Sequence, residues 1–262
     1  MFEQRLERRK KLKEKLRKRE RVFGGWISYR EPAIAETFAK AGLDFVAIDM
    51  EHTTISIDDA NRIITSVQGE ESICLPRPVS HNNDYIKPLL EAGADGTIIQ
   101  MVNTKSEAEE LLNLQKFPPI GKRSFGVNRA HGYGFDFDTY IKTWNESSIC
   151  MIQVESIVGV DNIEELLQVD GIDAVMIGPY DISGSLGLPG ETNHPKVREA
   201  CQRVVEACAR NGVSCMTQIS DVNTEAVNDA FAQGYTAIVL GSDLFVLWKW
   251  AADMKSLISS MR

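Results

Sequence analysis

Residues 149–178 read ICMIQVESIVGVDNIEELLQVDGIDAVMIG, and this stretch decides the fold. Two short apolar runs, at 149–155 and 174–178, enclose a segment of helical period near 158–168. Apolar runs of this length that alternate with helical segments are typical of parallel strands joined by crossover helices. The stretch therefore predicts one strand–helix–strand unit of a parallel sheet.

The same unit recurs along the chain from residue 22 onward. Strands are expected at 22–28, 45–50, 73–78, 96–101, 149–155, 174–178, 213–219 and 236–242. Helices are expected near 31–42, 58–68, 82–92, 105–115, 158–168, 196–211, 221–233 and 243–259. Eight such units in about 240 residues match the size of an α/β TIM (β/α)8 barrel.

A doubly wound open sheet is the competing architecture. Its first strand is usually followed by a glycine-rich phosphate-binding turn, whereas SYREP (28–32) follows the first strand here. We therefore expect one barrel domain over 22–262, preceded by a basic helical segment over 1–21. The connection 116–148 is far longer than an ordinary barrel loop, which predicts a lid or a binding loop.

The N-terminal segment is strongly basic. Residues 1–21 hold eleven Lys or Arg and four Glu, a charge of +7 that leaves −15 for the rest of the chain. One interpretation is an arm that binds nucleic acid or an anionic membrane. We favour a solvated helix with a thin apolar stripe of Leu6, Leu12 and Leu16, because the acidic body disfavours phosphate-backbone binding.

Composition predicts a protein of the cytoplasm with no membrane partner. No stretch approaches the roughly 18 uninterrupted apolar residues that span a bilayer, and the N-terminus is too basic for a secretory signal. The five cysteines are dispersed and form no CxxC pair. They indicate buried free thiols rather than a disulfide framework or a thiolate zinc site.

Polar residues end nearly every predicted strand. Catalytic groups of a barrel enzyme lie at the C-terminal ends of its strands, and carboxylates placed there are costly unless they are paired or bind metal. The polar groups and glycines at these ends are Asp49, Glu51, His52, Arg77, Gln100, Gln153, Glu155, Gly178, Tyr180, Asp181, Gln218, Gly241, Ser242 and Asp243.

Glu155 and Asp181 follow adjacent strands, so their carboxylates can converge on one hard cation. With no second or third histidine nearby, Mg²⁺ or Mn²⁺ suits these oxygen ligands better than zinc. The alternative is an internal ion pair of these acids with Arg77 or Arg123. His52 follows Asp49 closely and can act as a base oriented by that carboxylate.

Five segments in order resemble one family: DFVAIDMEH (44–52), LPRP (75–78), FPPIGKRSFG (117–126), IQVES (152–156) and DAVMIGPYDIS (173–183). They are similar to the HpcH/HpaI aldolases, the class II pyruvate aldolases, over residues 12–258. This family includes 4-hydroxy-2-oxoheptanedioate aldolase and 2-keto-3-deoxy sugar acid aldolases. The resemblance implies a TIM barrel whose last helix is exchanged between subunits, and a homo-hexamer built as a trimer of dimers.

The resemblance also implies an activity. The expected reaction is reversible aldol cleavage of a 4-hydroxy-2-oxo acid to pyruvate and an aldehyde, through a pyruvate enolate bound to a divalent ion (Mg²⁺, Mn²⁺ or Co²⁺). The implied roles are metal ligation by Glu155 and Asp181, enolate stabilisation by Arg77, acid/base catalysis by His52 held by Asp49, orientation of a metal-bound water by Glu51, and substrate binding by Gln153, Gly178, Tyr180, Gln218 and Arg123.

The sequence departs from the family pattern where the aldehyde is expected to bind. Met50 stands where glycine is common, and Gln218 stands where an aliphatic residue is common. The stretch GVNRAHGYGFDF (126–137) also differs from the dicarboxylate-degrading members. We therefore expect Gln218, Arg123, Arg129, His131 and Tyr133 to recognise a different, more polar aldehyde.

Two rival functions share the barrel. A CoA-ester lyase of the citrate or malyl-CoA lyase type uses similar metal carboxylates, but the Glu51-His52 pair and the chain length disfavour it. A non-catalytic barrel scaffold is the second rival, and it requires neither of the two metal carboxylates.

Overall fold

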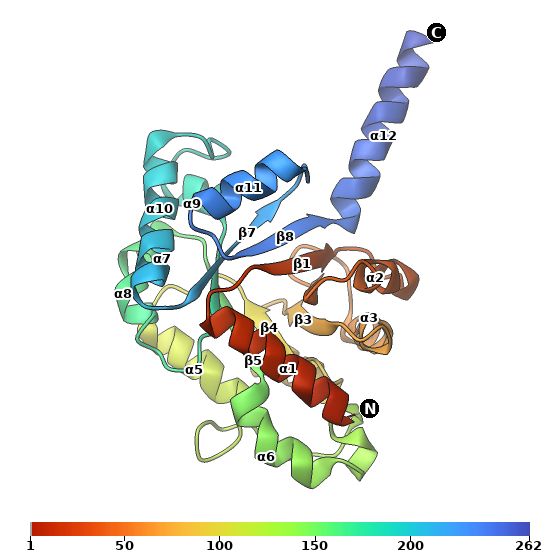
Figure 1. The fold of residues 1–262 in the computed structure, drawn as a ribbon, viewed down its shortest axis with the longest axis vertical. Coiled ribbons are helices and arrows are strands. Elements are labelled where there is room, and N and C mark those ends of the chain that lie inside the picture. The colour runs from red at the N-terminus through yellow and green to blue at the C-terminus, as the bar shows by residue number, and fades with distance from the viewer. Residues whose placement is uncertain (1) are drawn as a thin grey trace.

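The computed structural model describes residues 2–262, and a nearly closed barrel of eight parallel strands lies at its centre (Figure 1). The strands pair in the order β3-β2-β1-β8-β7-β6-β5-β4. The predicted (β/α)8 barrel is confirmed. The strands are β1 (Val22–Ile27), β2 (Phe45–Asp49), β3 (Ile73–Arg77), β4 (Gly96–Ile99), β5 (Ile149–Val154), β6 (Ala174–Ile177), β7 (Ser214–Ile219) and β8 (Ala237–Ser242).

Helices follow the strands and cover the outside of the barrel. The helix expected at 158–168 is broken, because Asn162 leaves helical geometry between α7 and α8. The helices are α1 (Phe2–Arg17), α2 (Pro32–Ala39), α3 (Ile57–Gly69), α4 (Asn83–Glu91), α5 (Lys105–Gln115), η1 (Arg129–Gly134, 3-10), α6 (Phe137–Ser147), α7 (Ile157–Asp161), α8 (Ile163–Leu166), α9 (Pro179–Ser185), α10 (Pro195–Arg210), α11 (Thr224–Ala232) and α12 (Asp243–Ser260).

The alternation of side chains along each strand separates two cores. Phe45 and Ala47 of β2 belong to the cluster that fills the barrel interior, whereas Val46 and Ile48 pack outward with α2 and α3. Successive side chains of a strand point to opposite faces, so Asp49 at the end of β2 must point inward. The same alternation directs the last residue of each strand toward or away from the mouth, which is the opening of the barrel at the C-terminal ends of its strands.

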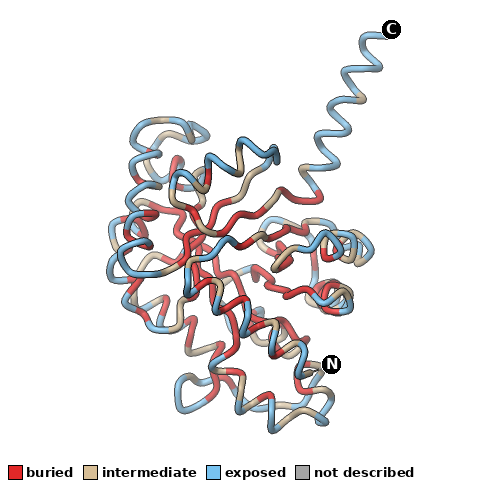
Figure 2. Tube along the Cα trace, viewed as in Figure 1, coloured by how far each residue is buried: buried red, intermediate tan, exposed pale blue. Residues whose placement is uncertain are grey.

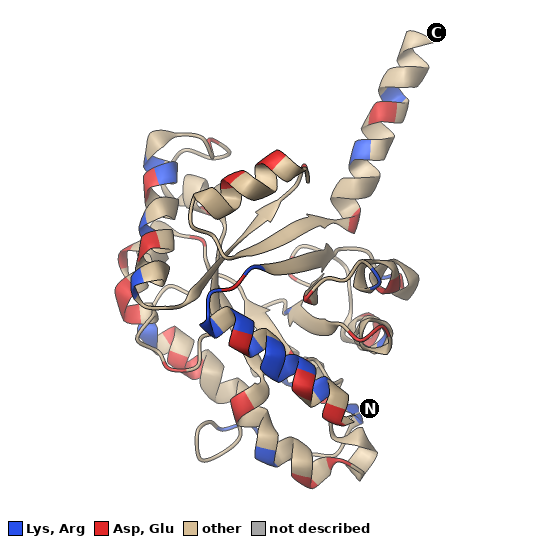
Figure 3. Cartoon of the chain, in the orientation of Figure 1, with Lys and Arg blue, Asp and Glu red and all other residues tan. Residues whose placement is uncertain are grey.

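The basic helix α1 closes the N-terminal end of the barrel (Figures 1 and 3). Leu12 and Leu16 join the barrel-interior cluster. Lys13 Nζ lies 2.7 Å from Asp173 Oδ1, and Arg9 Nη1 lies 3.3 Å from Asp95 Oδ1. These acids stand just before β6 and β4, so the buried basic face of α1 neutralises carboxylates at the strand beginnings.

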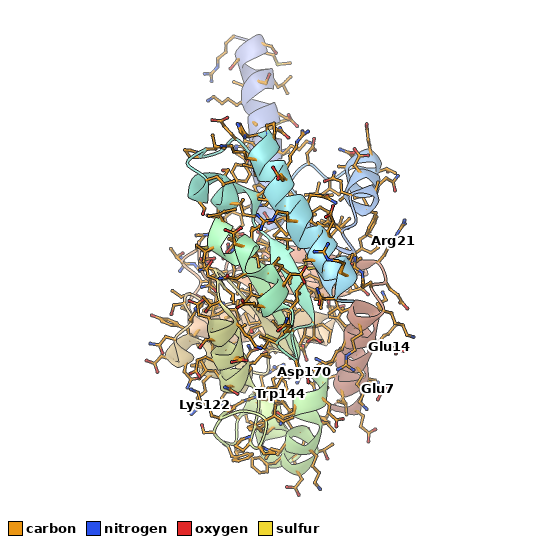
Figure 4. All side chains as sticks on the ribbon, turned by 90° about the vertical axis from the view of Figure 1, so that its left-hand side faces the viewer. Glu7, Glu14, Arg21, Lys122, Trp144 and Asp170 are labelled. Atoms are coloured by element: carbon orange, nitrogen blue, oxygen red, sulfur yellow. The ribbon has the colours of Figure 1, made fainter. Side chains whose placement is uncertain are left out.

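The outer face of α1 is solvated. Glu7 and Glu14 lie along this helix at the margin of the molecule in Figure 4, with side chains 73% and 64% exposed. The expected apolar stripe is confirmed, because Leu6, Leu12 and Leu16 are buried. The expectation that the basic residues are simply solvated is wrong for Arg9 and Lys13, which are buried and paired.

The long connection 116–148 lies at the same N-terminal end, away from the mouth. Lys116 Nζ donates to Ser148 Oγ at 2.7 Å, directly before β5. Arg129 Nη1 donates to the carbonyl oxygen of Ala92 at 2.9 Å, in the turn that precedes β4. The prediction that this connection forms a lid or binding loop is therefore wrong: it contains η1 and α6, and α6 lies beside α1 (Figure 1).

The last helix, α12, extends away from the barrel (Figure 1) and is exposed along most of its length (Figure 2). Val246, Trp248 and Trp250 are 60%, 67% and 62% exposed. Its first residue is anchored, since Asp243 accepts the backbone N–H groups of Ser28 and Tyr29 at 2.8 and 3.0 Å. Within residues 2–262, no helix is long and apolar enough to cross a bilayer.

We expect Lys13→Ala to lower the free energy of unfolding by about 3–5 kcal/mol, because Asp173 is left buried without its counter-ion. Urea denaturation measures the change. Lys10→Ala on the exposed face is the matched control, with an expected change below about 1 kcal/mol. Equal effects of the two substitutions would show that the Lys13–Asp173 pair does not hold α1 on the barrel.

Candidate active site

Side chains from β2, β3 and β5 meet at the C-terminal end of the barrel. Asp49 and Arg77 are partners in the β2–β3 register, and each lies two residues after an interior residue, Ala47 and Leu75. Glu155 directly follows β5, four residues after the interior Met151. Strand alternation therefore brings one cation and two acids to the mouth.

Arg77 is the centre of this group. Its Nη2 atom lies 2.8 Å from Asp49 Oδ1, its Nη1 atom lies 2.9 Å from Glu51 Oε2, and Nη1 donates to Gln153 Oε1 at 3.3 Å. The guanidinium carbon lies 4.8 Å from the centre of the Trp26 ring. A buried guanidinium with polar partners from β2, the turn after it and β5, and an aromatic face from β1, is held in one orientation.

Glu155 differs from Asp49 and Glu51, which pair with Arg77, because it is buried without a cation. Gln153 Nε2 donates to Oε1 and the Met101 backbone N–H donates to Oε2, both at 3.1 Å. Among residues 2–262 no Lys, Arg or His side chain lies within ion-pair distance of it. Burial raises the pKa of Glu155 to about 7, and the charge of Asp181 adds to the effect. A bound cation would offset this cost.

Asp181 lies in the first turn of α9 and is exposed. Its negative charge contributes to raising the pKa of both Glu51 and Glu155, so it lies near those carboxylates. No group of three or more His, Cys, Asp or Glu side chains in the described chain is arranged to hold a metal. The expected pair, Glu155 with Asp181, fits a hard cation that takes most of its ligands from water and substrate.

His52 and Asp49 are not joined as expected. Asp49 Oδ1 accepts the backbone N–H groups of Glu51 and His52 at 3.1 and 3.2 Å, besides its ion pair with Arg77. The His52 side chain is 66% exposed, and its Nε2 atom lies 3.6 Å from Glu51 Oε2. The carboxylate beside the His52 ring is therefore Glu51, while Asp49 shapes the turn that carries both residues.

The other predicted substrate residues at the mouth differ in exposure. The backbone of Gly178 lies so close to the Glu155 side chain that a Cβ atom at this position would lie 2.6 Å from Glu155 Oε1. Tyr180 is 71% exposed. Gln218 is half-buried at the end of β7. The cavity of about 720 Å³ that it lines is formed mainly by α10 and α11 on the outside of the barrel, and neither Arg77 nor Glu155 contributes to it.

Arg123 does not reach this site, so its assignment to substrate binding is wrong. Its Nη2 atom lies 2.9 Å from Glu91 Oε1, and its Nη1 atom donates to the Tyr140 hydroxyl at 3.0 Å. Glu91 ends α4, the helix that returns the chain to the N-terminal end of the barrel. His131 is fully buried in the same cluster, so these residues stabilise the long connection instead of recognising an aldehyde.

Sequence reasoning missed the backbone support of Glu155. Met101 adopts the left-handed region, with φ of 49°, and this conformation directs its N–H group at the carboxylate. Asn103 Nδ2 donates to the Met101 carbonyl at 3.0 Å, and the Ser156 hydroxyl donates to Asn103 Oδ1. No sequence signal marks a methionine for positive φ. Trp26, in contrast, could have been found from its inward register on β1.

The chain is similar to known proteins in sequence and in fold. Residues 23–249 match the model of the HpcH/HpaI aldolase/citrate lyase family. The chain is 37% identical over 198 residues to 2-keto-3-deoxy-L-rhamnonate aldolase of Salmonella typhi, covering 75% of this chain and 72% of the relative. A family protein from Burkholderia cenocepacia J2315 has a TM-score of 0.88 at 30% identity, covering 96% of this chain and 99% of that one. An HpcH/HpaI aldolase from Desulfitobacterium hafniense DCB-2 has a TM-score of 0.85 at 28% identity, covering 94% and 96%.

We expect Gly178→Ala to weaken Mn²⁺ binding about tenfold or more, because the new methyl group displaces Glu155 from its two hydrogen-bond donors. Electron paramagnetic resonance titration of free Mn²⁺ measures the affinity. Gly184→Ala, in the helix α9 that Gly178 precedes, is the matched control, since nothing lies within 4 Å of the position that its methyl group would take. Wild-type affinity in both variants would mean that Glu155 is not a metal ligand.

Proposed function

The chain belongs to the HpcH/HpaI aldolase/citrate lyase family, and we propose that it reversibly cleaves a 4-hydroxy-2-oxo acid to pyruvate and an aldehyde. It is a carbon–carbon lyase, a class II aldolase. Divalent-metal dependence is general in this family. The name of the Salmonella relative supports a 2-keto-3-deoxy sugar acid as the substrate, with a dicarboxylate as the alternative.

One observation carries the proposal: a buried carboxylate without a cation lies in the same mouth as a fixed guanidinium. In the proposed site Glu155 and Asp181 hold the divalent ion, for which we propose Mg²⁺ or Mn²⁺. The chemistry that the ion supplies when bound is Lewis-acid polarisation of the keto group of the substrate.

Arg77 supplies the second positive charge. In the cleavage direction the proton of the C4 hydroxyl leaves, the C3–C4 bond breaks, and the electron pair moves toward C3 and the keto oxygen. The resulting enolate of pyruvate then takes a proton at C3. Arg77 stabilises the negative charge on the keto oxygen, and because Asp49, Glu51 and Gln153 already hold its guanidinium, little reorganisation is needed during the reaction.

His52 is the proposed group that moves the protons. Its exposed ring lies at the rim of the site, and Glu51 lies between this ring and Arg77. Burial raises the pKa of the Glu51 carboxyl group, and the positive charges of Arg77 and His52 partly oppose this rise. Gln153 is the proposed neighbour of bound pyruvate, since it connects Arg77 to Glu155.

We also propose that the enzyme is a homo-hexamer, a trimer of dimers, in which α12 packs on a neighbouring copy. The exposed tryptophans of α12 support this arrangement, because a monomer rarely exposes such a run of large apolar residues. A cytoplasmic location is supported by the five cysteines, all of which are free thiols.

Light scattering is expected to give a mass six times the chain mass of 29.2 kDa. The double variant Trp248→Asp, Trp250→Asp is expected to give a smaller assembly, because charges replace the apolar contact surface of α12. Lys255→Ala on the same helix is the control and should keep the wild-type mass. An unchanged mass in the double variant would refute an interface built on these tryptophans.

The proposed reaction is tested by proton exchange at C3 of pyruvate in deuterated water, followed by NMR. We expect exchange with the wild-type protein, its loss with EDTA, and its return with Mg²⁺ or Mn²⁺. The measurement requires no knowledge of the aldehyde. Turnover of acyl-CoA thioesters without any exchange of pyruvate would instead identify a CoA-ester lyase, and no activity of either kind would indicate a scaffold.

A further inference from the structure

Gln100 is a buried amide at the mouth that the proposed reaction does not use. It directly follows β4, and the alternation that places Ile98 in the barrel interior turns the Gln100 side chain inward as well. The residue is 4% exposed. Gln100 lies between Pro78, which follows Arg77, and Met101, whose backbone N–H donates to Glu155.

The orientation of the Gln100 amide is determined by one contact. Its Nε2 atom donates to the carbonyl oxygen of Pro78 at 2.9 Å. Rotating the amide by half a turn would bring two carbonyl oxygens together, so the nitrogen must face Pro78. The Oε1 atom then points away from Pro78, and it is buried without a hydrogen-bond donor among residues 2–262.

This unpaired acceptor is unusual among the buried amides of the chain. Gln153, in the neighbouring strand, uses both ends of its amide, on Arg77 and on Glu155. Gln115, outside the barrel, accepts from the Thr97 hydroxyl and donates to the Leu111 carbonyl. A buried acceptor without a donor is unfavourable, so Gln100 Oε1 is suited to a ligand that brings a donor.

Substrate chemistry identifies the part of the molecule that supplies this donor. The pyruvate half of a 4-hydroxy-2-oxo acid offers only acceptors, a carboxylate and a keto group. The C4 hydroxyl becomes the aldehyde oxygen, which is an acceptor too. Donor hydroxyls that persist through the reaction are therefore on the aldehyde half, from C5 onward, and a terminal carboxylate there would be repelled by Oε1.

We propose that Gln100 is a specificity-determining residue whose Oε1 atom accepts a hydrogen bond from a hydroxyl group of the aldehyde. The inference rests on the proposed aldolase reaction and defines its substrate class as hydroxylated aldehydes without a terminal carboxylate. A site that pairs a buried polar group with a substrate hydroxyl discriminates strongly against analogues that lack it.

The test compares pyruvate additions to glycolaldehyde, to acetaldehyde, which lacks the hydroxyl group, and to succinic semialdehyde, which carries a carboxylate. The wild-type enzyme is expected to have the highest kcat/KM with glycolaldehyde. Gln100→Met keeps the length of the side chain and removes the acceptor. It is expected to lower the ratio of kcat/KM for glycolaldehyde over acetaldehyde about tenfold or more.

Gln115→Met is the matched control, because it removes a buried glutamine outside the site and should leave this ratio unchanged. A ratio that is the same in Gln100→Met and wild type would overturn the inference, as would a wild-type preference for succinic semialdehyde. The wild-type comparison can still overturn the inference if Gln100→Met does not fold, because an enzyme that prefers acetaldehyde or succinic semialdehyde would not use the proposed hydrogen bond. C3 proton exchange separates the two failures: its presence without selectivity contradicts only this inference, and its absence contradicts the proposed function as well.

Discussion

The ion pairs of Arg77 are the interaction on which the rest of the site depends. This one guanidinium balances Asp49 and Glu51 and hydrogen-bonds Gln153, so it ties together the ends of β2, β3 and β5. Without it, two carboxylates would face each other in a largely buried space, at a high desolvation cost. Because Arg77 is occupied by these partners, Glu155 is left with amide and backbone donors alone. This division of the charges, with paired acids around Arg77 and an unpaired acid beside them, supports the proposed position of the cation at Glu155.

The two ends of the barrel differ in whether their buried carboxylates have counter-ions. At the N-terminal end, each buried acid has its counter-ion: Asp173 has Lys13, and Asp95 has Arg9. At the C-terminal end, Glu155 has none in the described chain. A barrel keeps its stabilising contacts at the first end and its chemistry at the second. The basic helix α1 therefore contributes to the stability of the fold, while the unpaired carboxylate is the group that we propose binds the metal.

Much of this could be predicted because parallel strands place their ends together. Position at the C-terminal ends of the predicted strands was enough to select Asp49, Arg77, Gln153 and Glu155 as neighbours, since parallel strands end at the same edge of the barrel. Arg123 lay beyond such reasoning, because the destination of a long connection depends on tertiary packing rather than on local pattern. The contact of Asp49 with the His52 backbone instead of its ring depends on how the turn after β2 folds. The positive φ of Met101 and the burial of Lys13 likewise depend on partners distant in sequence.

The central claim is that Glu155 is kept unpaired in order to bind a divalent ion. It is tested most directly by the thermal stability of wild type and Glu155→Gln with and without Mn²⁺, since an ion that binds only the folded state raises the Tm. The account predicts that Mn²⁺ raises the Tm of the wild-type protein and leaves that of Glu155→Gln unchanged. An equal rise in both proteins would contradict it.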